Sequence, residues 1–102
     1  MLELRPNCEL CDKDLPPDCS DVRICTYECT FCADCVGTVS GNVCPNGGGG
    51  FCERPVRPKH ARREGVSLDF QRASTKRVVT EYTQNEIVEF ARKVKSTDPV
   101  NR

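Results

Sequence analysis

The chain has 102 residues, a formal net charge of zero and nine cysteines, with four phenylalanines, two tyrosines and no tryptophan. So short a chain with so few aromatic residues can bury little apolar surface, so something besides a hydrophobic core must stabilise its fold. No apolar run approaches the roughly 20 residues that cross a bilayer, which excludes a membrane-spanning segment.

The cysteines indicate bound metal rather than disulfides. The first ten residues, MLELRPNCEL, lack the charged and apolar regions of a secretory signal, so we expect a cytoplasmic protein with reduced thiols. An odd number of cysteines also leaves one unpaired in any disulfide scheme. The two-residue spacers at Cys8/Cys11, Cys29/Cys32 and Cys32/Cys35 are typical of zinc knuckles, in which a tight turn points both sulfurs at one ion.

The first half of the chain, residues 1–53, is predicted to be a zinc-binding domain with little regular structure. A short hairpin is expected from Ile24 to Phe31 and a short helix from Ala33 to Val39. The apolar side chains available to pack around the metal are Leu2, Leu4, Val22, Ile24, Phe31 and Val36. The predicted fold class is therefore a small, zinc-stabilised α+β domain.

Seven of the cysteines divide most simply into two interleaved sets. Cys29, Cys32 and Cys35 cannot easily all join the Cys8/Cys11 knuckle on one ion. The division that leaves the fewest thiols unused gives the first zinc Cys8, Cys11, Cys32 and Cys35, and the second zinc Cys25, Cys29 and Cys44. Each ion then ties together distant segments, and metal binding offsets the entropy cost of closing those loops.

The order of these cysteines resembles that of a RING-type treble-clef domain. The pattern is C-x2-C, thirteen residues, C-x3-C-x2-C-x2-C, eight residues, then CP. More narrowly, MLELRPNCELCDKDLPPD, RICTYECTFCADC and NVCPNGGGG resemble a small bacterial family, domain of unknown function 1272, over about residues 1–58. The resemblance implies a cross-brace of two zinc sites. Family members usually end the last knuckle as CPxC, whereas this chain has Gly47 at that position.

The missing cysteine leaves three outcomes open for the second zinc. Cys52 could supply the fourth sulfur, because the glycine run 47–50 lets the backbone fold back without steric cost. A water molecule or another external ligand could complete the site instead. The site could also be weak or vacant. Cys19 is a less favoured substitute and is interpreted as a free thiol in the loop after Pro16 and Pro17.

The second half of the chain differs from the first in charge. Residues 1–53 carry nine acidic and three basic side chains, whereas residues 54–102 carry six acidic and twelve basic ones. The stretch RPVRPKHARR lacks aromatic side chains that could stack on bases, so residues 54–73 are predicted to form a basic, partly disordered linker, and nucleic-acid binding is disfavoured.

Residues 74–102 are predicted to form a C-terminal extension with one amphipathic helix. Thr83 and Glu86 form a capping box ahead of an apolar stripe, which indicates a helix over about 84–95. The run KRVVTEY at 76–82 favours either a short strand or an extended lead-in to that helix. The sequence leaves open whether the extension docks on the zinc domain.

A non-enzymatic zinc-binding module that contacts another protein is the function that the sequence favours. The only histidine, His60, lies in the basic linker, and no phosphate-binding loop, nucleophile–base pair or small-molecule site is recognisable. One alternative is a thiol-based redox or metal sensor, in which incomplete coordination exposes Cys25, Cys29 and Cys44 to oxidation. Another is a RING-type ubiquitin ligase, which the resemblance suggests through Leu10 and Pro45.

Overall fold

A three-stranded antiparallel sheet lies at the centre of the computed structural model, which describes residues 1–102. Its strands are β1 (Val22–Ile24), β2 (Thr30–Cys32) and β3 (Cys52–Glu53), in the order β2-β1-β3. Ile24 pairs with Thr30 on one side and with Cys52 on the other. The predicted hairpin between Ile24 and Phe31 is confirmed, and its turn carries Cys25 and Cys29.

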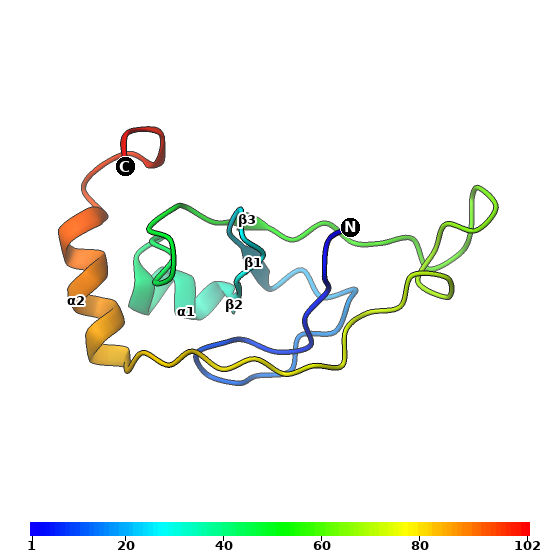
Figure 1. Ribbon diagram of the computed structural model, residues 1–102, viewed down its shortest axis with the longest axis horizontal. Coiled ribbons are helices and arrows are strands. Elements are labelled where there is room, and N and C mark those ends of the chain that lie inside the picture. Colours follow the sequence, from blue (N-terminus) through cyan, green and yellow to red (C-terminus); the bar gives the residue numbers. More distant parts are fainter.

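A short helical segment follows β2 directly. Helix α1 (Ala33–Cys35) continues into a π-helical turn, η1 (Val36–Ser40), so the helix predicted over 33–39 is confirmed. It ends at Gly41, whose φ of 55° lies in the left-handed region that glycine tolerates. The molecule is therefore a small α+β protein whose regular elements are short (Figure 1).

Cysteine residues make up most of the core. Six of the ten residues in the main buried cluster are cysteines; its members are Cys8, Leu15, Val22, Cys25, Cys29, Phe31, Cys32, Cys35, Val36 and Cys44. Phe51 packs against this cluster, with its ring edge-on to that of Phe31 at a centroid distance of 5.5 Å. Aliphatic burial alone is thus small, as the composition predicts.

Arg54 was expected to begin a solvated linker but is buried, with 1% of its surface exposed. Its guanidinium donates hydrogen bonds to the backbone oxygens of Arg5 (2.9 Å), Leu15 (3.4 Å) and Pro16 (3.0 Å). The first-half fold therefore extends to include Arg54, because this side chain joins the N-terminal segment to the loop after Leu15.

The basic segment beyond Arg54 forms a long loop that leaves the sheet and returns alongside the N-terminal segment (Figure 1). Arg57 pins its base by donating to the backbone oxygens of Leu2 and Gln71, both at 2.7 Å. The amide of Leu68 donates to Pro58 O at 2.9 Å and closes the loop above this base. That residues 54–73 separate two independent parts of the chain stays a prediction.

The chain then runs in extended form alongside the first cysteine knuckle. The amide of Thr80 donates to Glu9 O at 2.7 Å, and Asn7 exchanges two side-chain hydrogen bonds with the backbone of Val78. Arg77 bonds Asp12 and Asp14 at the surface. Residues 76–82 are therefore the extended lead-in rather than a strand of the sheet.

Helix α2 (Gln84–Val94) follows and packs against η1. The predicted capping box is confirmed, because Thr83 and Glu86 exchange side-chain to backbone hydrogen bonds of 2.9 and 3.1 Å. Ile87 and Ala91 form its buried face. A 3₁₀ turn, η2 (Pro99–Asn101), brings the chain back onto the glycine run, where a Cβ on Gly50 would lie 3.2 Å from Pro99 Cγ. No helix is long and apolar enough to cross a membrane.

Replacing Ile87 by alanine is expected to loosen α2 from the rest of the protein. Ile87 is 2% exposed, so the change removes buried methylene groups and leaves a cavity that costs about 2 kcal/mol or more. Hydrogen exchange of the α2 amides should accelerate relative to those of β1. The matched control is Val88→Ala on the exposed face, which should leave both rates unchanged. Equal effects of the two changes would contradict the docked position of α2.

Candidate metal centres

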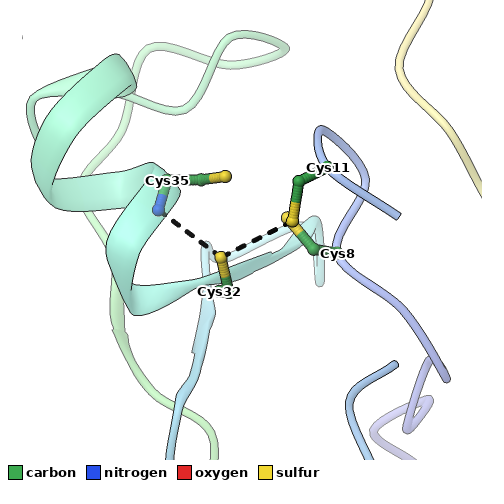
Figure 2. Close-up of side chains that lie close together, drawn as sticks. All are labelled: Cys8, Cys11, Cys32 and Cys35. Atoms are coloured by element: carbon green, nitrogen blue, oxygen red, sulfur yellow. Dashed lines mark hydrogen bonds between the residues drawn. The ribbon is translucent and has the colours of Figure 1, made fainter. Parts of the chain in front are cut away.

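Four cysteines from two distant segments form the first group. The sulfurs of Cys8, Cys11, Cys32 and Cys35 all lie within 4.8 Å of one another. Figure 2 shows the pair from the N-terminal knuckle facing the pair at the start of α1. The Cys11 and Cys32 sulfurs are 3.9 Å apart, and the Cys35 amide donates to Cys32 Sγ at 3.5 Å, which caps α1. The structure thus gathers the four thiols that the sequence assigned together.

Backbone hydrogen bonds shape the knuckle that carries Cys8 and Cys11. The Cys8 amide donates to Lys13 O, and the Asp12 amide donates to Cys8 O, both at 2.9 Å. Asp12 adopts a left-handed conformation with φ of 62°, which turns the chain back after Cys11. These bonds hold the two sulfurs on the same side of the turn.

Two buried polar side chains anchor this knuckle, and the sequence patterns did not identify either. Asn7 donates to Cys8 O at 3.1 Å and to Asp12 Oδ1 at 2.9 Å. The carboxylate of Glu9 accepts the Thr30 amide at 2.5 Å and Arg5 Nη1 at 2.8 Å. Because Thr30 begins β2, Glu9 fixes the knuckle against the strand that delivers Cys32. Asn7 directly precedes Cys8 and Glu9 directly follows it, and this adjacency to a predicted ligand is the only local signal that marks them.

Three cysteines form the second group. The sulfurs of Cys25, Cys29 and Cys44 lie within 4.8 Å of one another, and all three residues are buried. The β1–β2 turn supplies two of them, because the Cys25 amide donates to Cys29 O at 3.2 Å. The turn after Cys44 is closed by the Gly48 amide, which donates to Cys44 O at 2.7 Å. The two groups therefore alternate along the chain as predicted.

Nitrogen donors point at the sulfurs of the second group. The Tyr27 amide donates to Cys25 Sγ, and the Asn46 side chain donates to Cys29 Sγ, both at 3.3 Å. Such donors favour thiolates over thiols. Sequence reasoning missed Asn46; its position inside the last knuckle, two residues after Cys44, is the signal that could have found it.

The thiols of both cysteine groups need a nearby positive charge if they are to ionise together. Burial, together with the neighbouring thiolates, raises the pKa of Cys35 and Cys44, that of Cys44 to about 12. Burial also raises the pKa of Cys29. Burial opposes ionisation of Cys8 as well, but the amides of Cys11, Cys32 and Leu10 together lower its pKa. Clustered thiols cannot all ionise without a positive charge, and a bound metal supplies one.

The donor sets suit zinc. Thiolate ligands select soft or borderline ions, and four cysteine sulfurs in two two-residue knuckles form the common structural zinc site. Cys8, Cys11, Cys32 and Cys35 make such a set, whereas Cys25, Cys29 and Cys44 make one with a ligand missing. The residues present therefore fit two metal ions with unequal coordination.

Cys52, one of the three possibilities that the sequence left open for the second site, is not part of the cysteine group. It is exposed, and its backbone pairs with Ile24, so its side chain shares a face of the sheet with that residue. Cys19 also lies outside both groups and accepts a hydrogen bond from the Asp21 amide at 3.4 Å. A Cβ on Gly47 would lie 3.2 Å from the ring of Tyr27, so an aromatic side chain stands against the position that lacks a ligand.

Comparisons with known proteins cover the cysteine-bearing half of the chain. Residues 1–57 match the family described as "Protein of unknown function (DUF1272)". Over 58 residues the chain is 66% identical to an uncharacterised protein of Rhizobium meliloti (strain 1021), a match that covers 57% of this chain and 69% of that protein. No solved structure matches. The similarity ends before the loop and the extension that carries α2.

Proposed function

The chain belongs to the DUF1272 family of proteins of unknown function, and we propose that it is a non-enzymatic zinc-binding module that contacts another protein. In this proposal the two cysteine groups form a RING-like, treble-clef cross-brace in a reducing compartment such as the cytoplasm. The observation that carries it is the alternation of Cys8/Cys11 and Cys32/Cys35 with Cys25/Cys29 and Cys44 in two tight sulfur groups.

A structural role is supported by where the metal would act. The first group joins the N-terminal knuckle to α1, and the second joins the β1–β2 turn to the loop before β3. Each ion would therefore close a long loop in a fold whose apolar core is small. The free energy of metal binding then contributes to the stability of the fold, as it does in small zinc domains.

The side chains near the thiols support a role without catalysis. His60 is exposed in the basic loop. Glu28, the nearest acid in sequence to Cys29, accepts the Glu3 amide at 2.6 Å and so holds the N-terminal segment in place. Glu53 is exposed in β3. None of these groups is held against the three-thiol group as a general base would be.

A protein partner is supported by the surface beside α2. Tyr82, Val88 and Phe90 are exposed apolar side chains on or next to this helix. A hollow of about 420 Å³ lies between the helix and the last knuckle, and its lining combines Tyr82, Ile87 and Phe90 with Glu86, Glu89 and Lys93. Apolar side chains rimmed by polar ones in this way are typical of protein contacts. The acidic first half disfavours nucleic acid.

Native mass spectrometry of the reduced protein tests the metal assignment. We expect two zinc ions in the wild type and the same number in Cys52→Ser, because Cys52 lies outside the sulfur group. Cys44→Ser removes one of only three thiols and should lower the count to one. A wild-type protein without zinc would overturn the proposal, and loss of an ion in Cys52→Ser would make Cys52 a ligand.

A thiol-based sensor is the second candidate, and one observation favours it. Cys25 and Cys44 line a hollow of about 390 Å³ that opens to solvent. Peroxide could therefore reach this group and convert two thiolates and two protons to a disulfide and two water molecules, releasing zinc. Mild peroxide should then empty the second site before the first, as measured by zinc release. Equal resistance of both sites would exclude the sensor. The ligase alternative has less support, since Pro45 is buried and faces the hollow beside α2.

A further inference from the structure

We infer that the second metal site takes its fourth ligand from solution, and that this ligand is a small thiol carrying a carboxylate. The inference rests on the proposed function, because it requires a metal ion at Cys25, Cys29 and Cys44. It follows from the hollow beside the second sulfur group, here named the thiol hollow. Its lining residues include Cys25, Tyr27, Cys44, Gly47, Phe90 and Arg102.

The protein supplies three sulfurs to this site and no fourth ligand atom. No histidine, acidic or further cysteine ligand joins the group of Cys25, Cys29 and Cys44. Gly47 has no side chain to offer, and the ring of Tyr27 lies against it. Zinc bound by cysteines is almost always four-coordinate, so one ligand must come from elsewhere.

The thiol hollow gives that ligand a way in. Its volume is about 390 Å³, and its walls include two of the three cysteines together with the backbone of the glycine run. Tyr27, which stands beside the missing position, is largely exposed and can turn aside. The hollow therefore brings a molecule of a few heavy atoms to Cys25 and Cys44, and a turn of the Tyr27 ring would uncover the sulfurs, which are buried in this structure.

The residues that line the thiol hollow determine which kind of ligand it favours. A metal already bound by three thiolates favours a fourth soft donor, which a small thiol provides after losing its proton to solvent and displacing water. Arg102 lies at the rim, with Nη1 bonded to Asn42 O at 2.9 Å and to Gly48 O at 3.2 Å. These bonds hold the guanidinium in place, and it favours a carboxylate. Phe90 and Val94 provide the apolar wall between the two ends.

Cobalt substitution tests the inference. Reduced protein loaded with two equivalents of Co²⁺ is titrated with mercaptoacetate, 2-mercaptoethanol or acetate, and thiolate-to-cobalt absorption is recorded. We expect mercaptoacetate to raise this absorption, 2-mercaptoethanol to do so about threefold more weakly, and acetate to have no effect. Arg102→Ala should remove the preference for mercaptoacetate while keeping the response to 2-mercaptoethanol.

Two variants separate the possible failures. Gly47→Cys supplies a fourth protein sulfur and should abolish the response to added thiols; Tyr27→Ala/Gly47→Cys does the same if the ring obstructs the new side chain. Cys44→Ser should bind one Co²⁺ and show no response. Failure of the wild type to bind a second Co²⁺ would overturn the proposed second site. Binding of two ions with no response to either thiol would overturn only the external-ligand inference.

Discussion

Removing the metal ions that we propose for the two sulfur groups is expected to unfold residues 1–54. Six of the ten residues in the main core cluster are cysteines. Four of these six lie outside every helix and strand, so regular secondary structure does not hold them in place. Structural zinc contributes about 10–16 kcal/mol in small zinc domains, which equals or exceeds the whole stability of a typical domain. Excess chelator under reducing conditions should therefore collapse the dispersion of the amide NMR spectrum.

Restoring zinc provides the control for this experiment. The dispersed spectrum should return when zinc is added in excess over the chelator, because the thiols stay reduced. Cys35→Ser lacks one ligand of the four-sulfur group, so its spectrum should regain less dispersion on addition of zinc than that of Cys52→Ser. A spectrum that stays sharp and dispersed in chelator would show that apolar packing alone maintains the fold.

Replacing Arg54 by methionine is expected to lower the free energy of unfolding of the protein by about 2–3 kcal/mol, because backbone oxygens lose a charged hydrogen-bond donor. The change keeps an unbranched apolar stem but removes the guanidinium and its bonds to the oxygens of Arg5, Leu15 and Pro16. The Pro16 oxygen keeps the Cys19 amide as a partner at 3.0 Å, whereas the oxygens of Arg5 and Leu15 would lose theirs beside a buried side chain. Urea unfolding followed by circular dichroism measures the loss.

Arg57→Met is the matched control for this substitution. Arg57 also donates to two backbone oxygens, but it is half-buried, so water can replace the guanidinium. Its loss should cost about 1 kcal/mol. Arg54→Lys keeps the charge and should still be destabilising, because an ammonium group cannot span three carbonyls. Equal losses at the two arginines would contradict a structural role for Arg54.

Local sequence patterns predicted the elements that depend on neighbours in the chain. The spacing of cysteines gave the two sulfur groups, since a two-residue spacer constrains the turn wherever it occurs. The apolar residues around Cys25 gave the hairpin, and Thr83 with Glu86 gave the start of α2. Of the proposed packing residues, Leu2 alone is only partly buried, while Leu15 and Val43 are buried without having been proposed.

Long-range contacts could not be predicted in this way. Arg54 begins a stretch of prolines and basic residues, which indicates a solvated linker, and only the distant carbonyls explain its burial. The docking of the extension depends on Asn7 and Glu9 bonding backbone more than 70 residues away, which no periodicity encodes. The position of Cys52 follows from its pairing with Ile24, which the glycine run alone did not reveal.

The basic loop between Arg57 and Leu68 is a suitable place for a label. Arg57 and the Leu68 amide hold its two ends together, and the residues from His60 to Glu64 between them are exposed. An affinity tag or fluorescent label inserted there would extend outward without altering either sulfur group, because the closed base isolates the insertion. This loop therefore offers a place to attach a probe for partner searches while all nine native thiols remain available.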